Sequence, residues 1–395
     1  MDTIQRVDKT RKLSQGVDYY DWESNLKIHL QFLRVMGLWP SGDKSFTPGL
    51  YMLYSYTIVL LVACHVFFLT INIYFVRHDL EAVVANMYIL LATIVTKIKA
   101  WFLLINIKVL KARLVDLQNF YSFQPKNPNQ TLLIENSLKT WRFIFTSFVL
   151  TCFGCNLFWM VPLLLTSGEK MLPFLAWYPF NTKVSPVFEI TYVYQMFCTS
   201  YLTLVSLNVD PLVCIFNVYI ACQFEMLSDN LKKFASGDLD EARENFLSCI
   251  THHRQILSFL KGCNQFYKWI VFWHLIISGI SIGIGMFQLC SVAPLSTEFY
   301  SLVSFESAVI VQISMYCYFG NNVEVTSNLV SYALFESGWP DLSENMKKEL
   351  LIFTANVQQP VKVSCFNIFM LSLDTLLKIL KTAWSYFALL SNLKS

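Results

Sequence analysis

A row of residues near the C-terminal end of the sequence shares one face of a helix. At 100° per residue, its members fall within a stripe about 80° wide. They are Asp374, Lys378, Lys381, Ser385, Leu389 and Asn392. These charged, hydroxyl and amide groups bind water and ions, and they form no nucleophile–base pair. Charged groups inside an apolar segment usually face a bundle interior or a water-filled cavity, so the stripe predicts a surface along which ions move.

Two interpretations of this stripe remain open. One is an internal salt bridge, because Asp374 and Lys378 are four residues apart, but it leaves Ser385 and Asn392 unexplained. The other, which we favour, is a pore wall formed by copies of the helix around a symmetry axis. Leu389 would then form an apolar constriction, and such constrictions gate by dewetting. The pattern therefore favours an oligomeric channel.

Other residues with reactive side chains carry weaker signals. Cys152 and Cys155 have the CxxC spacing of metal and redox sites, but they stand among Phe153 and other apolar residues. We therefore expect them to pack as small hydrophobes. The pair His252-His253 has no further ligand at a suitable spacing, and we expect it on a solvated helix. The sequence predicts no catalytic residues, no metal site and no cofactor, so an enzyme is not expected.

The composition is that of a membrane protein. Of the 395 residues, 55% are hydrophobic and only 14% are charged, whereas an ordinary soluble domain has about 25% charged residues. A membrane helix needs about 20 mostly apolar residues, and seven stretches meet this requirement. They lie at about 45–76, 82–107, 143–167, 190–222, 269–293, 300–320 and 366–390. We expect an all-α, polytopic protein with seven transmembrane helices in a lipid bilayer, and no nucleic-acid partner.

The basic residues give the chain a direction across the membrane. The segments outside the spans alternate between the two sides of the membrane. Those on the same side as the N-terminal segment hold 22 of the 30 Lys and Arg residues, and those on the opposite side hold four. Positive residues favour the cytoplasmic side, which predicts a cytoplasmic N-terminus and an extracellular C-terminus. Lys97 and Lys99 remain near the inner end of the second span, where we expect their side chains to reach the interface.

The cytoplasmic segments also contain helical patterns. Residues 223–268 have apolar positions at helical spacing, so we expect the fourth and fifth spans to extend inward and pack together. Ser343 is a predicted N-cap of an amphipathic helix at 344–357, and Pro360 prevents its continuation. The expected order is a cytoplasmic segment (1–45), spans one to four (46–222), anchor helices (223–268), spans five and six (269–320), a second anchor segment (321–365), and the last span with an extracellular tail (366–395).

Short motifs in the C-terminal third are recognisable. They are Tyr318-Phe319-Gly320-Asn321, Ser372-Leu373-Asp374, Ser385-Tyr386-Phe387-Ala388-Leu389-Leu390, and Trp339 between them. Through these motifs, the chain resembles the insect odorant receptors over about residues 305–394. Over the rest of the chain, its length, its seven predicted spans and its predicted orientation support the same resemblance. The closing motif departs from the TYxxxxxQF pattern of gustatory receptors. The chain also lacks the large cytoplasmic insert of the odorant co-receptor, so it resembles a ligand-tuned subunit.

The resemblance implies an odorant-gated, non-selective cation channel for olfactory sensory transduction. It implies a heterotetramer with the odorant co-receptor, in the plasma membrane of an olfactory sensory neuron dendrite. The last helices would meet at a pore, with Leu389 at the gate and Asn392 and Leu393 beside it. The alternative is a seven-helix metabotropic (G-protein-coupled) receptor, which the opposite orientation disfavours. A transporter would show internal repeats or broken midplane helices, and neither is present.

The resemblance places an odorant pocket in the outer half of the membrane. Its walls vary within the family, and for each single candidate ordinary helix packing is favoured over contact with the ligand. The candidates are Met87, Tyr88, Leu91, Thr151, Gly154, Cys155, Phe158, Tyr192, Met196, Thr199, Val309 and Gln312. Together they are apolar and aromatic with few hydrogen-bonding groups. Such walls suit a small volatile ester, alcohol or aromatic rather than an acid or amine.

Overall fold

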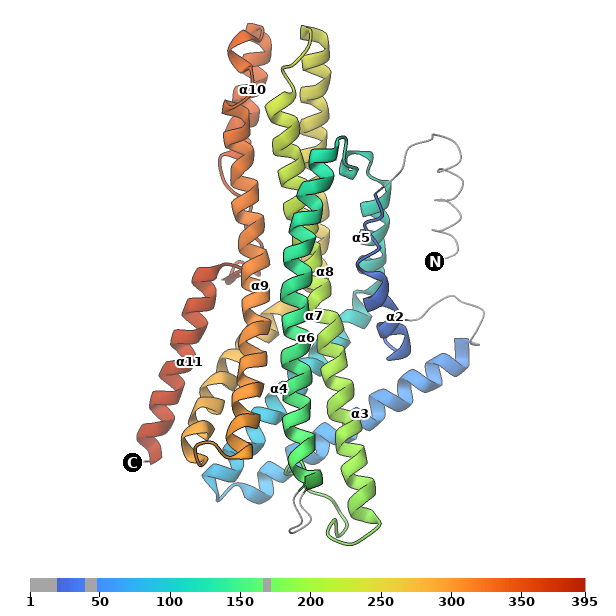
Figure 1. The fold of residues 1–395 in the computed structure, drawn as a ribbon, viewed down its shortest axis with the longest axis vertical. Helices are drawn as coiled ribbons and strands as arrows, with labels where there is room; N and C mark the ends of the chain where they lie inside the picture. The colour runs from blue at the N-terminus through green and yellow to red at the C-terminus, as the bar shows by residue number, and fades with distance from the viewer. Residues whose placement is uncertain (1–19, 40–47, 166–171, 395) are drawn as a thin grey trace.

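The computed structural model describes residues 20–39, 48–165 and 172–394, with the side chains of residues 48, 160–165 and 390–394 left out. Long helices run along one axis of an elongated molecule (Figure 1). The elements are α2 (Lys27–Val35), α3 (Pro48–Val76), α4 (Leu80–Ile105), α5 (Ile107–Asn119), η1 (Tyr121–Phe123), α6 (Pro128–Leu165), α7 (Val187–Lys233), α8 (Leu239–Ser291), α9 (Thr297–Phe335), η2 (Trp339–Asp341), α10 (Glu344–Val357), β1 (Ser364–Cys365), β2 (Phe369–Met370) and α11 (Leu373–Lys394).

Six of the described helices are long and apolar enough to cross a membrane. They are α3, α4, α6, α7, α8 and α9, and each of the predicted spans one to six overlaps one of them, in the same order. The all-α prediction is confirmed, with a two-stranded hairpin as the one piece of sheet among the described residues. The seventh predicted span corresponds to α11, which differs from the six because its first turns carry three charged residues.

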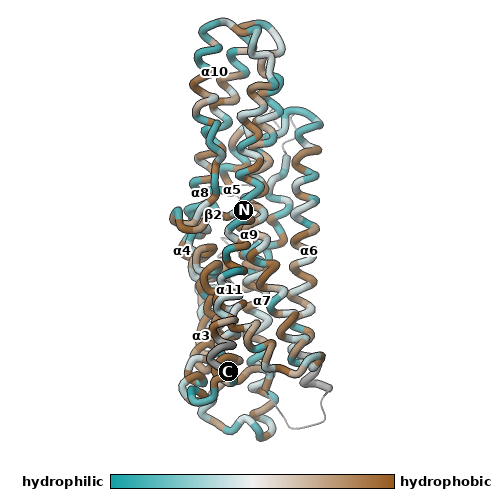
Figure 2. Tube along the Cα trace, turned by 90° about the vertical axis from the view of Figure 1, so that its left-hand side faces the viewer, coloured by the Kyte–Doolittle hydropathy of each residue, from teal (hydrophilic) through white to brown (hydrophobic). Residues whose placement is uncertain are grey.

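Three helices continue well beyond the length that a bilayer requires. α7, α8 and α9 have 47, 53 and 39 residues, whereas about 20 suffice to span the hydrocarbon core. The helices expected in 223–268 are therefore continuations of α7 and α8, and they pack against each other through Phe234 and Phe246. Hydrophobic colouring is dense where α3, α4 and α11 are labelled, and hydrophilic colouring is more frequent around α10 (Figure 2).

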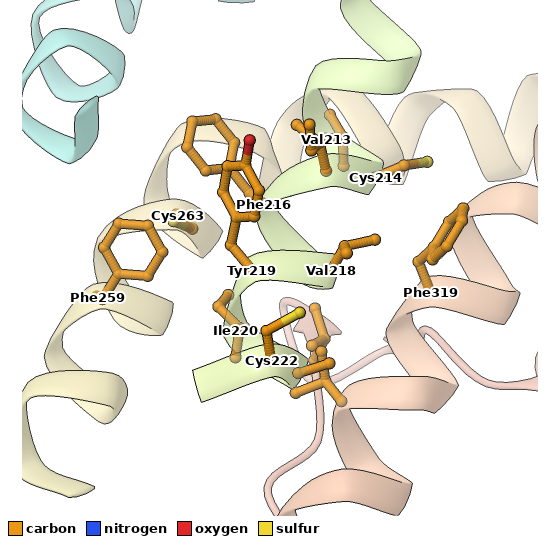
Figure 3. Close-up of a cluster of buried hydrophobic side chains, with 14 of the residues drawn as sticks. Val213, Cys214, Phe216, Val218, Tyr219, Ile220, Cys222, Phe259, Cys263 and Phe319 are labelled. Atoms are coloured by element: carbon orange, nitrogen blue, oxygen red, sulfur yellow. The ribbon is translucent and has the colours of Figure 1, made fainter. Parts of the chain in front are cut away.

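α7 is the central element of the fold. In its most apolar stretch, 89% of the residues are buried, because its side chains are apolar around the whole circumference. Figure 3 shows its side chains between Phe259 and Cys263 of α8 on one side and Phe319 of α9 on the other. Several buried polar side chains of α7 have partners within the chain; for example, the amide oxygen of Asn217 accepts a 2.8 Å hydrogen bond from the hydroxyl of Tyr267.

The histidine pair on α8 was expected on a solvated helix, and this prediction is wrong for His252, while His253 is partly exposed. His252 is 2% exposed, and its Nε2 is hydrogen-bonded at 2.9 Å to the amide oxygen of Gln223 on α7. Its ring also packs beside that of Phe123. The prediction failed because the sequence did not show that η1 and α7 cover this face of α8. Burial lowers the pKa of His252 to about 3.

The predicted break before the last helix is confirmed. α10 covers the predicted residues 344–357, and the Ser343 side chain accepts a hydrogen bond from the amide of Met346. The chain then forms the antiparallel hairpin, in which Ser364 pairs with Met370. Gly320 of α9 lies against Leu371 at the end of this hairpin, with no room for a Cβ. This contact fixes the point from which α11 descends along α8 (Figure 1).

Candidate functional site

A small cavity lies among five of the long helices. Its volume is about 140 Å³, and α4, α6, α7, α8 and α9 all contribute to its wall. The lining residues are Ile89, Ala92, Thr93, Val95, Thr96, Cys152, Cys155, Asn156, Trp159, Phe174, Thr199, Leu202, Thr203, Ser206, His274, Ile277, Ser278, Ser281, Phe305, Ala308, Val309 and Gln312. None of them is acidic or basic apart from the histidine. An enclosed, mostly apolar space with a few polar groups is the usual form of a small-molecule site.

Four of the twelve predicted pocket residues line this cavity. They are Cys155, Thr199, Val309 and Gln312. Tyr88 is buried directly behind the wall, where its ring lies 6.5 Å from Trp159 and 5.4 Å from Phe305. The remaining seven do not line it: Met87, Leu91, Thr151, Gly154, Phe158, Tyr192 and Met196. The depth of a residue in its span follows from the sequence, but the face of the helix that it occupies does not.

Several of those seven face other surroundings. Phe158 is exposed and stacks on Tyr300 at 6.2 Å. A Cβ added to Gly154 would meet nothing within 4 Å. Met196 is buried, but away from the cavity wall. The polar lining residues Thr93, Asn156 and His274 are not among the candidates, although each is a hydrogen-bonding group within an apolar span.

A buried ion pair adjoins the cavity. The Lys99 ammonium lies 2.9 Å from the Asp210 carboxylate, and both side chains are 0% exposed. Asp210 also accepts hydrogen bonds from Gln312 and Tyr316, both at 2.6 Å. A buried charge is tolerated when it is paired and its remaining lone pairs are satisfied. The network joins α4, α7 and α9, and Gln312 belongs to both the network and the cavity wall.

The ion pair corrects the prediction for Lys99. We expected this side chain to reach the interface, but it points inward because α7 offers a carboxylate at the same depth. The sequence did contain a signal. Lys99 and Asp210 are opposite charges in two apolar spans, and such charges usually pair with one another. Their separation of 111 residues belongs to no periodic pattern, so spacing could not reveal the pairing.

α8 separates the cavity from α11. His274, Ser278 and Ser281 of α8 line the cavity. A Cβ at Gly279 would contact Ile379 of α11, and one at Gly283 would lie 2.7 Å from the Cβ of Tyr386. At 100° per residue, the three cavity-lining residues and the two glycines lie on roughly opposite sides of α8. Small residues four apart allow membrane helices to approach closely, and this Gly-xxx-Gly sequence is a signal that the sequence analysis overlooked.

α11 has one packed face and one exposed face. Ile379 and Ala383 are buried against its neighbours. The members of the polar stripe with described side chains, Asp374, Lys378, Lys381, Ser385 and Leu389, are exposed, and Leu389 is 60% exposed. Lys378 bridges to Asp374 at 2.6 Å, with 72% and 70% of the two side chains exposed. The side chains of Asn392 and Leu393 lie outside the described residues.

A groove lined by both polar and apolar side chains runs beside this exposed face. It has a volume of about 770 Å³ and lies between α8, α9, the hairpin and α11. Its walls include Asn321, Glu324, Asp374 and Lys378. Two members of the stripe, Asp374 and Lys378, thus share this groove with the polar side chains of α9. Among the described residues, no group of three His, Cys, Asp or Glu side chains is arranged to hold a metal ion.

Comparisons with known proteins cover most of the chain. A family model described as 7tm odorant receptor matches residues 79–384. Odorant receptor 94a of Drosophila melanogaster is 22% identical over 383 residues, covering 94% of this chain and 98% of that receptor. Odorant receptor 82a of the same species is 21% identical over 377 residues, covering 92% and 97%. The olfactory receptor OR5 of Machilis hrabei, solved in complex with eugenol, has a TM-score of 0.83 at 16% identity and covers 94% of this chain and 98% of its own.

Proposed function

We propose, from the premise that this chain belongs to the insect odorant receptor family, that it is the odorant-binding subunit of a cation channel formed with the odorant co-receptor. The family consists of odorant-gated ion channels, and the chain is one of its multi-pass membrane proteins. We place it in the plasma membrane of an olfactory sensory neuron dendrite, where it would serve olfactory transduction.

The observation that carries the proposal is the cavity beside α8. Its 140 Å³ is close to the roughly 150 Å³ of an engineered apolar cavity that admits benzene. The occupant would therefore be a small volatile with one ring or a short chain. The structure of OR5 with eugenol supports a ligand site within this fold. We assign the odorant to the cavity and treat the candidates outside its wall as packing residues.

The pore would be formed by the exposed stripe of α11. Four subunits with seven spans each and cytoplasmic N-termini would bring their α11 helices together around an axis. Asp374, Lys378, Lys381 and Ser385 would then face water and permeant cations. Leu389 would close the pore, with Asn392 and Leu393 as its neighbours. Replacing Leu389 with Ala is expected to raise the basal current severalfold, and unchanged gating and permeation would contradict this assignment.

The cytoplasmic extension would hold the subunits together. Its helices expose large apolar side chains that are not covered within the chain: Val325, Leu329, Tyr332 and Phe335 on α9, and Leu351 and Ile352 on α10. Exposed apolar patches of this kind mark protein–protein contacts. These side chains belong to the end of the molecule at which α10 is labelled (Figure 1). This end would form the anchor. The parts of the α11 helices near the axis would remain free to move.

α8 would transmit ligand binding to the pore. A ligand that moves the cavity face of α8 also moves the glycine face on which α11 packs. Interfaces packed this tightly shift between discrete arrangements rather than deforming continuously. Opening would splay α11 and move Leu389 away from the axis.

The test is to co-express the chain with an insect odorant co-receptor and record currents while volatiles are applied under blockade of G-protein signalling. We expect odorant-evoked cation currents that survive the blockade. Currents abolished by it would overturn the channel assignment and favour a metabotropic receptor.

A further inference from the structure

The polar atoms in the cavity wall divide into two groups. The hydroxyls of Thr93, Thr96, Thr199 and Thr203 each donate to a backbone carbonyl of their own helix. The amides of Asn156 and Gln312 also donate within the chain. By contrast, both ring nitrogens of His274 and the hydroxyl of Ser281 are buried without a hydrogen-bond partner. Buried polar groups are rarely left unpaired in folded proteins, so these two side chains point to an absent partner.

The two unpartnered side chains belong to the same wall. His274 is 1% exposed and Ser281 is 3% exposed, and both line the cavity from α8. Seven residues separate them, so they share one face of the helix. The ring of His274 lies edge-on to the ring of Tyr316, with the two ring centroids 5.2 Å apart. This ring contact provides no hydrogen bond to either nitrogen. The α8 wall of the cavity therefore has unused hydrogen-bonding capacity, whereas the four threonine hydroxyls and the two amide groups of the other walls donate within the chain.

We propose that the ligand of this cavity is a small volatile alcohol whose hydroxyl group hydrogen-bonds His274, with Ser281 as the second contact along the same wall. This inference rests on the proposed function, because it names the class of odorant for the same site. A neutral imidazole presents one donor and one acceptor. A hydroxyl group also donates and accepts, so it can satisfy either nitrogen. An ether or ester can only accept, and a hydrocarbon does neither.

The surroundings disfavour an acidic ligand. No described residue in the wall is acidic or basic other than His274. The nearest ion pair, Lys99 with Asp210, is closed by its own hydrogen bonds from Gln312 and Tyr316. An acid would thus be buried without a counter-charge, which is strongly unfavourable.

The first test requires no mutation. Benzyl alcohol, its isomer anisole, and toluene have similar sizes, so thermal stabilisation of the purified chain by each gives their relative affinities. We expect benzyl alcohol to bind about tenfold more tightly than anisole, since anisole can accept a hydrogen bond but cannot donate one, so the bond donated to the acceptor nitrogen of His274 is lost, with toluene weakest. This order is the reverse of their hydrophobicity. Equal binding, the order set by hydrophobicity, or no binding of benzyl alcohol would overturn the inference.

The second test assigns the preference to α8. His274→Phe is expected to remove the alcohol preference, and Ser281→Ala to reduce it. His274→Gln retains a donor and an acceptor and is expected to preserve it. A preference that survives in both His274→Phe and Ser281→Ala would overturn the assignment. The same ligands are applied to the complex with the co-receptor: binding with alcohol preference but without evoked current would contradict the proposed channel, while the inference about the ligand would stand.

Discussion

α7 and α11 both carry charged residues within apolar sequence, but the charge on α7 is buried and the charges on α11 are exposed. Asp210 of α7 is fully buried and bonded to Lys99, Gln312 and Tyr316. On α11, Asp374 and Lys378 pair with each other and remain exposed. The stretch of α7 around Asp210 is buried on all sides within the chain, whereas α11 packs on α8 through one face.

The difference separates the two roles of charge in a membrane helix. A paired, buried charge completes the interior of one subunit and fixes how helices meet. An exposed charge at similar depth needs water or another subunit beside it, because lipid solvates it poorly. We therefore regard the α7 network as the structural support of the cavity and the α11 stripe as a surface that becomes complete on assembly.

The largest effect is expected from breaking the buried pair. Lys99→Met leaves the Asp210 carboxylate without its counter-ion, and removing one partner of a buried pair costs about 3–5 kcal/mol. We expect loss of folded receptor at the cell surface, measured by surface labelling. Adding Asp210→Asn, which can still accept from Tyr316, should restore part of the expression.

The exposed pair supplies the matched control. Asp374→Asn removes the carboxylate of an ion pair of the kind that contributes little to stability, so expression should remain near that of the wild type. If Lys99→Met and Asp374→Asn reduced expression equally, the contrast between the two helices would be wrong.

A smaller effect is expected where α11 meets α8. A Cβ at Gly283 would lie 2.7 Å from the Cβ of Tyr386 and 3.0 Å from the carbonyl oxygen of Ala383. Overpacking of this kind costs about 1–3 kcal/mol, so Gly283→Val should displace α11 and reduce the odorant-evoked current more than surface expression. Gly49→Val is the control, because a Cβ at Gly49 meets nothing within 4 Å. Equal currents in the two variants would show that α11 does not depend on this contact.

The smallest effect concerns pH. Burial lowers the pKa of His252 from 6.5 to about 3, so between these values the unfolded chain binds a proton that the folded chain does not. The contribution of His252 to the free energy of unfolding is therefore fully present above pH 6.5. It decreases as the pH falls, by about 1.4 kcal/mol at pH 5.5. Thermal unfolding of the purified chain at pH 7.5 and 5.5 measures this. His252→Gln should reduce the difference, and an unaltered pH dependence would contradict the assignment.

Local patterns predicted much of this fold. The helix at 344–357 and its Ser343 cap depend on neighbouring residues, and both are found. The packed face of α11 follows from helical periodicity, and Ile379 and Ala383 are buried as that pattern requires. Contacts between distant segments were not predicted. The Lys99–Asp210 pair and the burial of His252 both depend on which helices become neighbours, and the periodicity of one helix carries no information on its partners.

The cavity was predicted only in outline for the same reason. The depth of a residue in its span follows from its position in the sequence, but the face it turns inward depends on how five helices pack. This explains why Val309 and Gln312 line the cavity while Phe158 and Gly154 do not. His274 was missed because a single histidine in an apolar span resembles an ordinary buried residue.

The most direct test of the contrast is cysteine accessibility along α11 in the complex with the co-receptor. Lys381→Cys and Ser385→Cys lie on the exposed stripe, and Ile379→Cys and Ala383→Cys lie on the packed face. A charged, membrane-impermeant thiol reagent is applied during odorant-evoked currents. The proposed pore predicts that modification of the two stripe positions changes the current and that the two packed positions do not react. Equal reactivity of both faces, or no reaction at the stripe, would contradict a pore lined by α11.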